Sequence, residues 1–262
     1  MQQIGFAGFT ARIALAATLL LGAVTAAPAQ GLFGLGAAAQ GSMECFSTEG
    51  HTVRVERFDP CDPCGTGRFP AIVLLYGTDG MDKYGTQVRA AASQLADNGF
   101  AAFIVYYFDG PGGHCSGTSM ADISPAQFRA WVRTVKAGIS YAQAQPNVRA
   151  NRVGIAGFSL GSAVGLSVAA TDARVDAIVD AFGALPAQYR KDAANMPPTL
   201  IVHGECDDIV PVAEAYSLAN LLRRNGVPHD IVVYAGRGHT LDARSLRHAS
   251  ERGLLFFRAY LR

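Results

Sequence analysis

The chain has 262 residues, of which 50% are hydrophobic and 16% are charged, and its formal net charge is +1. Such a composition excludes a disordered chain, and the length suits one large domain with a buried core. Lys and Arg never follow one another for more than two positions, so nothing indicates a nucleic-acid or anionic-membrane partner. We therefore expect a globular domain whose partner is a small molecule.

The first 29 residues are predicted to form a secretory signal peptide. Arg12 precedes an apolar run at 13–26, and Ala27, Pro28 and Ala29 supply the small residues of a cleavage site. An uncleaved anchor is less favoured, because a membrane-spanning helix needs roughly 20 apolar residues. We expect cleavage after Ala29 and a periplasmic or secreted mature protein.

A short leader and an edge strand are predicted next. Residues 30–42 are rich in Gly and Ala and show no period of helix or strand, which indicates a flexible leader. The folded domain is then expected at 43–262. Alternating apolar residues at 52–58 predict an exposed strand, paired with the stretch around 43–46.

Five cysteines follow the predicted signal peptide, at positions 45, 61, 64, 115 and 206. Disulfides persist in exported proteins, and an odd number leaves one thiol over. Cys61 and Cys64 form one CxxC with Pro and Gly around it, which favours a structural disulfide over a redox pair. Cys45 is an alternative partner for either thiol. No second CxxC and no HExxH is present, so no metal ion is expected.

The rest of the chain alternates apolar runs with segments of helical spacing. The runs, typical of strands buried on both faces, are 71–76, 101–107, 153–156, 177–179, 200–202 and 231–234. The helical segments are 83–98, 125–145, 160–170, 212–225 and 243–260. Ser124 before Pro125 is a capping pair for the second helix. This order predicts a single-domain α/β fold, a mostly parallel sheet with helices on both faces, whose site forms at the carboxyl ends of the strands.

The strand at 153–156 leads into GFSLG, which matches GxSxG at a strand-to-helix turn. A serine on so sharp a turn has a strained backbone, and small residues two positions to either side let strand and helix pass closely. The hydroxyl is then presented clear of the sheet, at the positive end of the helix. We predict Ser159 as a nucleophile; the alternative is a glycine-rich turn needed only for packing.

A serine nucleophile needs a base, which follows the acid in the chain order of this fold. His239 comes after the last predicted strand, with Gly236 and Gly238 before it, and is the predicted base. His229 opens that strand at the opposite end of the sheet, and His248 lies within the final helix. Both are expected to be ordinary polar residues.

The loop HGECDDIVP, at 203–211, offers the acid that orients the base. Asp207 is preferred, because it follows Gly204 by three residues and precedes the turn into the next helix. Asp208 is expected to cap that helix. His203 precedes the acid and is expected to be a structural histidine, while Asp180, after the preceding strand, is the alternative acid.

Two backbone N–H groups are predicted to form an oxyanion hole. Leu160, directly after the nucleophile, supplies one. Thr78 supplies the other from the glycine-containing turn after the strand at 71–76, with Asp79 as the alternative. Tyr76 is expected to line the pocket.

Together, GFSLGS, HGECDDIVP and GRGHT resemble the dienelactone hydrolase family of α/β-hydrolases, over residues 53–262. The segments WVRTVKAGISYAQAQPNVRANRVGIAGFSLG and VYYFDGPGG are also similar to parts of that family. The resemblance implies a compact, nearly lidless hydrolase of esters or lactones without metal or organic cofactor. Two departures matter. Ser159 stands where the best-known members have cysteine, and Arg237 and Arg244 do not clearly correspond to their carboxylate-binding arginines, so dienelactone itself is not the expected substrate.

The sequence therefore predicts a serine hydrolase that cleaves carboxylic esters or lactones through an acyl-enzyme on Ser159, with Asp207 and His239 completing the triad. Two alternatives stay open. A secreted peptidase or acyltransferase could use the same triad, and a non-catalytic binding protein could use the same fold.

Overall fold

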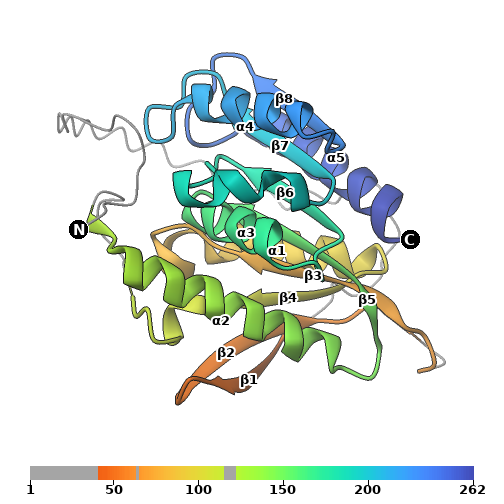
Figure 1. The fold of residues 1–262 in the computed structure, drawn as a ribbon. Helices are drawn as coiled ribbons and strands as arrows, with labels where there is room; N and C mark the ends of the chain where they lie inside the picture. Colours follow the sequence, from red (N-terminus) through yellow and green to blue (C-terminus); the bar gives the residue numbers. More distant parts are fainter. Residues whose placement is uncertain (1–40, 63–64, 115–121) are drawn as a thin grey trace, which may run out of the picture.

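The computed structural model describes residues 41–62, 65–114 and 122–262, so the predicted signal peptide and most of the leader lie outside the described residues. Within the described part, eight strands form one sheet with helices on both faces (Figure 1). The predicted α/β fold with a mostly parallel sheet is confirmed.

Each predicted strand and helix corresponds to an element of the structure. The strands are β1 (Ser42–Thr48), β2 (His51–Phe58), β3 (Phe69–Leu75), β4 (Ala101–Val105), β5 (Val148–Phe158), β6 (Ala177–Ala181), β7 (Thr199–Gly204) and β8 (His229–Tyr234). The helices are α1 (Gly80–Asp97), α2 (Pro125–Gln143), α3 (Leu160–Thr171), α4 (Val212–Arg224) and α5 (Ala243–Leu261), with the 3-10 helices η1 (Tyr107–Asp109) and η3 (Ala187–Asn195).

The sheet order is β1-β2-β4-β3-β5-β6-β7-β8. β1 pairs with β2, and β2 with β4, in antiparallel fashion, whereas all pairs from β4 to β8 are parallel. Helices α1 and α5 cover one face of the sheet, and α2, α3 and α4 cover the other (Figure 1). The parallel strands therefore end at one common edge, where β5, β7 and β8 run into the three segments of the predicted site.

Burial explains why the strands differ in sequence pattern. Every residue of β4 and all but the first of β3 are buried, because helices cover both faces there, and such strands read as continuous apolar runs. The residues of β2 alternate more between buried and exposed positions. Ser124 caps α2 as predicted, since its hydroxyl accepts a hydrogen bond from the N–H of Gln127 at 3.1 Å.

β4 ends two residues before the predicted limit of its apolar run. The N–H of Tyr106 donates to the carbonyl of Arg54 (3.0 Å), after which the chain turns into η1. The guanidinium of Arg54 also binds the carboxylate of Asp109 at 2.7 and 2.9 Å. These contacts tie the turn to β2, and Tyr107 and Phe108 are buried in it.

Of the five cysteines, the structure describes Cys45, Cys61 and Cys206, which are exposed and form no disulfide with one another. Cys64 and Cys115 lie outside the described residues. The Cys61–Cys64 disulfide therefore stays a prediction. No helix in the described ranges is both long and apolar enough to cross a membrane.

Two glycines where α5 packs on the sheet should respond oppositely to an added methyl group. A Cβ on Gly154 of β5 would lie 2.8 Å from Cδ1 of Ile72 and 2.9 Å from side-chain atoms of Phe257 and Leu261, whereas one on Gly253 of α5 would meet nothing closer than 3.9 Å. Gly154→Ala should therefore lower the free energy of unfolding by about 1–3 kcal/mol through overpacking. Gly253→Ala should raise the free energy of unfolding by up to about 1 kcal/mol, because glycine is less favourable than alanine in the interior of a helix. Urea unfolding measures both, and a neutral Gly154→Ala would contradict the tight contact of α5 with β5.

Candidate active site

The turn between β5 and α3 presents Ser159 at the carboxyl edge of the sheet. Ser159 has φ 55° and ψ −119°, a conformation that residues other than glycine rarely adopt. Its N–H donates to the carbonyl of Ala181 at 2.9 Å, and its carbonyl accepts from the N–H groups of Ser162 and Ala163 at 2.9 and 3.1 Å. The end of β6 and the first turn of α3 therefore hold the strained residue from both sides.

The glycines around Ser159 are required by close backbone contacts. A Cβ on Gly157 would lie 2.5 Å from Cα of Ser162, and one on Gly161 would overlap the carbonyls of Leu75 and Tyr76. Because these atoms belong to the backbone, no side chain can move aside to make room. The predicted physical reason for the GxSxG spacing is confirmed.

His239 lies between Ser159 and Asp207. Its Nε2 is 2.8 Å from Oγ of Ser159, and its Nδ1 is 2.7 Å from Oδ2 of Asp207. A carboxylate can only accept, so Nδ1 carries the hydrogen and Nε2 is left to accept from the serine hydroxyl. The structure thus brings the three residues predicted from sequence into one hydrogen-bonded row.

The Asp207 carboxylate is buried and accepts several hydrogen bonds. Oδ1 accepts from the N–H groups of Ile209 (2.9 Å) and Val210 (2.8 Å), and Oδ2 also lies 3.3 Å from Nε2 of His203. Burial alone would raise the pKa of Asp207, but the hydrogen bonds from His203, His239 and Val210 outweigh it and hold that pKa well below its usual range. Asp207 therefore carries a negative charge at neutral pH.

Asp208 does not cap α4, so that prediction is wrong. Pro211 occupies the N-cap position, and no side chain caps the helix there. The reason is that Asp207 itself closes the turn through the N–H groups of Ile209 and Val210, which leaves Asp208 exposed.

The remaining candidate acid and bases have other partners. Oδ1 of Asp180 accepts from the N–H of Gly183 at 3.0 Å and contacts the hydroxyl of Ser162, so the structure brings Asp207, not Asp180, to His239. Nδ1 of His229 is 2.8 Å from the carbonyl of Val227, and Nδ1 of His248 is 3.0 Å from the Tyr234 hydroxyl. These are ordinary polar contacts, as predicted for both histidines.

The loops after β7 and β8 are tied to each other. The N–H of Cys206 donates to the carbonyl of Arg237 at 2.7 Å, and the carboxylate of Glu205 accepts from the N–H of Gly236 at 2.9 Å. Two hydrogen bonds therefore join the loop that carries the acid to the loop that carries the base.

The loop after β3 lies against the nucleophile. A Cβ on Gly77 would be 3.3 Å from Cβ of Ser159, and Leu160 is the first residue of α3. The N–H groups of Thr78 and Leu160 thus belong to the two segments that adjoin Ser159. Their role as an oxyanion hole stays a prediction.

Tyr76 is buried beneath the loop after β3 and does not line an open pocket. The expectation that Tyr76 lines the pocket is therefore wrong. Its ring is buried and stacks on Tyr107 with 4.8 Å between centroids. The Tyr107 hydroxyl donates to the Tyr76 carbonyl at 2.7 Å, and the Tyr76 hydroxyl accepts from the N–H of Phe108 at 3.4 Å. These bonds fix the backbone that leads to Gly77.

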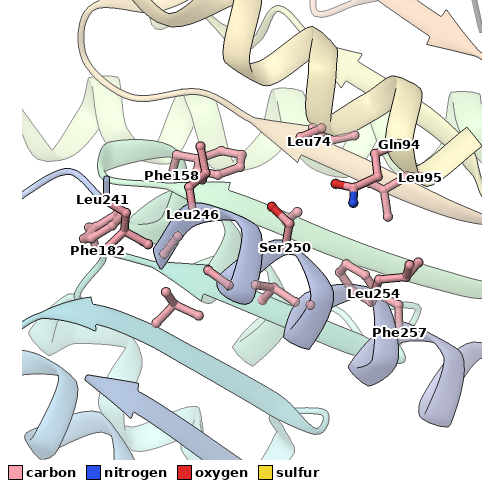
Figure 2. Close-up of a pocket in the computed structure, with 17 residues that line it drawn as sticks. Leu74, Gln94, Leu95, Phe158, Phe182, Leu241, Leu246, Ser250, Leu254 and Phe257 are labelled. Carbon is pink, nitrogen blue, oxygen red and sulfur yellow. The ribbon is translucent and has the colours of Figure 1, made fainter. Parts of the chain in front are cut away.

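An apolar pocket of about 100 Å³ lies between α1, α5 and the sheet (Figure 2). Phe158, Phe182 and Leu241 line its end nearest the candidate site. Phe158 directly precedes Ser159, and the ring centroid of Phe182 is 5.5 Å from that of His239. The pocket therefore shares part of its wall with the supports of the nucleophile and the base.

Sequence reasoning missed Phe182. This residue has φ 60°, which is exceptional for a bulky side chain, and it is the second strained residue at this edge of the sheet. Its ring packs between His239 and His203, whose ring centroid is 5.9 Å away. The only hint in the sequence is its place three residues after the strand predicted at 177–179.

Across the described ranges, no group of three or more His, Cys, Asp or Glu side chains is arranged to hold a metal ion. The candidate site instead holds a serine hydroxyl, an imidazole and a carboxylate in contact with one another. Such a row can form a nucleophile at neutral pH without a metal.

The parallel sheet and the strained turn at its carboxyl edge define a member of the α/β-hydrolase superfamily. More closely, a model of the dienelactone hydrolase family matches residues 59–253, which is more than half of the chain. The chain belongs to this family.

Individual relatives are distant. A protein of Bradyrhizobium sp, named "Probable 2-oxo-3-(5-oxofuran-2-ylidene)propanoate lactonase", is 25% identical over 197 residues, covering 68% of this chain and 75% of its own. A dienelactone hydrolase-like promiscuous phosphotriesterase from metagenomic libraries superposes with a TM-score of 0.71 at 21% identity, covering 86% of this chain and all of its own. A puromycin-hydrolyzing peptidase of Mycobacterium tuberculosis superposes with a TM-score of 0.72 at 17% identity, over 87% of this chain and 40% of its own. At such identities the two structures share the fold alone.

Replacing each of the two adjacent aspartates by Asn should have very different effects. Asp207→Asn keeps the shape but favours the wrong imidazole tautomer, and a change of that kind costs about 10⁴ in turnover in serine proteases. Asp208→Asn, the matched control, alters an exposed side chain and should change turnover little and stability by less than about 0.5 kcal/mol. Turnover of a p-nitrophenyl ester measures both. Equal losses would mean that the two carboxylates share the role.

Proposed function

We propose that the protein is a serine hydrolase that cleaves carboxylic esters or lactones through an acyl-enzyme on Ser159. The observation that carries the proposal is the continuous row from Oγ of Ser159 through His239 to Asp207, at 2.8 and 2.7 Å. The backbone strain at Ser159 supports it too, since strain of this kind gathers at functional residues. Membership of a family of hydrolases agrees with this activity.

In the proposed first half-reaction, Oγ of Ser159 attacks the substrate carbonyl while Nε2 of His239 takes its proton. The charge of Asp207 stabilises the imidazolium, and the N–H groups of Leu160 and Thr78 donate to the oxyanion. When the tetrahedral intermediate collapses, the C–O bond to the alcohol breaks and His239 returns the proton to that oxygen. In a lactone the alcohol stays attached to the acyl group.

In the second half-reaction, His239 takes a proton from water, whose oxygen attacks the acyl-enzyme. When this second intermediate collapses, the bond from the acyl carbon to Oγ of Ser159 breaks, the carboxylic acid leaves, and His239 returns the proton to Oγ. No step calls for a metal or an organic cofactor. The lactonase activity in the name of the Bradyrhizobium relative supports a lactone or ester as the substrate class.

The nucleophile can be tested by comparing two serines of α3 and its N-terminal turn. Ser159→Ala should abolish labelling by a fluorophosphonate probe and lower ester turnover by several powers of ten, because triad members act as one unit. Ser167→Ala is the control: this buried hydroxyl donates to the Ala163 carbonyl at 2.8 Å, within the helix. It should leave labelling intact. Labelling that persists in Ser159→Ala would contradict the proposal, and so would failure of the wild-type protein to react.

We also propose that the protein acts outside the cytoplasm. The charge and apolar pattern of residues 1–29 predicts export, so N-terminal sequencing of protein from the periplasm or medium should begin at Gln30. A retained Met1 would refute export.

Peptide mapping of the same material without reduction should find Cys61 joined to Cys64. Two free thiols would refute the disulfide.

A further inference from the structure

A second histidine, His203, also contacts the carboxylate of the proposed catalytic acid, Asp207. His203 is the last residue but one of the buried strand β7 and is itself fully buried. Its Nε2 lies 2.8 Å from the carbonyl oxygen of Val210 and 3.3 Å from Oδ2 of Asp207. A carbonyl can only accept, so Nε2 must carry a hydrogen, which both oxygens share. Oδ2 of Asp207 is also the oxygen that His239 contacts at 2.7 Å.

A buried carboxylate lies on the neighbouring strand. Asp180 of β6 pairs in register with Ile201 of β7, so His203, two residues further on, lies on the same face of the sheet as Asp180. Both side chains are fully buried. Oδ1 of Asp180 is held by Gly183 and Ser162.

One atom of each side chain lacks a hydrogen-bond partner in the described part of the chain: Oδ2 of Asp180 and Nδ1 of His203. Buried polar atoms without a partner are rare and costly. The negative charge of Asp180 on the neighbouring strand contributes to raising the pKa of His203. A leucine in either place would avoid the cost of an unpartnered polar atom, so core packing does not account for this polar pair.

We propose that His203 is a positioning residue for the catalytic acid: through Nε2 it fixes the carboxylate of Asp207 and shares its negative charge with His239. The proposal rests on the function proposed above. It extends the row of three groups to four, from Ser159 through His239 and Asp207 to His203.

The electrostatics agree with this arrangement. Burial would lower the pKa of His203, but its contacts with Asp207 and Val210 outweigh burial and raise that pKa. Burial raises the pKa of Asp180, although Ser162 and His203 oppose that effect. The titratable groups that face His203 are Asp180 from β6 and Asp207 from the loop after β7, with His239 beyond Asp207.

The simplest competing explanation is that His203 only closes the turn to Val210. The two roles differ in what they affect. A turn-closing contact acts on stability, whereas a shared hydrogen bond also sets how strongly Asp207 attracts a proton on His239. Without His203, the charge of Asp207 acts on His239 alone, which favours the imidazolium and removes the neutral base at a higher pH.

The test compares His203→Leu with His203→Gln, whose amide N–H can take the place of Nε2–H. In folded His203→Leu, kcat for a p-nitrophenyl ester should fall roughly ten- to a hundredfold with little change in KM, as for loss of a hydrogen bond to a charged group. The acid limb of kcat/KM against pH should move up by about half a unit or more. His203→Gln should recover most of both effects.

His229→Leu is the matched control, because His229 also contacts a backbone carbonyl, that of Val227 at 2.8 Å, but at the opposite end of the sheet. It should leave the pH profile unchanged. An unmoved acid limb in His203→Leu, or equal losses in the Leu and Gln variants, would overturn the proposal.

Histidine ¹⁵N NMR of the intact wild-type protein keeps the proposal testable even if His203→Leu does not fold. The Nε2 signal of His203, assigned by its loss in His203→Gln, should show a bonded hydrogen across the pH range of activity. An Nε2 without hydrogen would overturn the proposal whether or not the protein hydrolyses esters. Conversely, a wild-type protein that neither reacts with fluorophosphonate nor hydrolyses esters would overturn the proposed function while leaving the NMR result to stand for His203.

Discussion

The contacts of one buried carboxylate organise the carboxyl edge of this protein. Asp207 accepts hydrogen bonds from the N–H groups of Ile209 and Val210 and from His239. Nε2 of His203 also contacts its carboxylate. A carboxylate removed from water is costly unless such donors replace its hydration. The donors come from the turn after β7, from the base and from the end of β7. All three segments therefore depend on the position of the Asp207 carboxylate.

The sheet makes that convergence possible. Because β5, β6, β7 and β8 are parallel neighbours, their ends bring residues far apart in the chain to one edge, as the strand order requires. The loops then join each other directly, as Glu205 and Gly236 do. On the other side of the nucleophile, the stacked Tyr76 and Tyr107 hold the loop after β3 in place. Hydrogen bonds and ring stacking thus hold the candidate site on both sides.

The features that sequence reasoning predicted are those set by local pattern. Continuous apolar runs identified the parallel strands because both faces are covered, and GFSLG identified the elbow because the backbone leaves no room for larger neighbours. Ser159 followed from that motif, and His239 and Asp207 followed from the chain order of this fold; their contact agrees with these predictions.

The features that were missed depend on contacts between distant segments. The sequence near Asp208 suits a helix cap, and nothing local shows that Asp207 closes the turn and leaves Asp208 exposed. Likewise, nothing local in the sequence shows that the Nε2 of His203 lies 3.3 Å from Oδ2 of Asp207. The strained backbone of Phe182 and the burial of Tyr76 are also products of packing at the sheet edge, which the order of residues does not reveal.

The elbow has a consequence for how such enzymes diversify. Its steric demands fall on Gly157 and Gly161, where any added carbon meets backbone, and on the left-handed conformation of the residue between them. None of these demands specifies whether that residue ends in oxygen or sulfur, since serine and cysteine differ in a single atom beyond Cβ. The backbone of the turn therefore fixes the position of the side chain between the two glycines, but not whether that side chain is serine or cysteine. Relatives with cysteine and this chain with serine can descend from one architecture without any rebuilding of the fold.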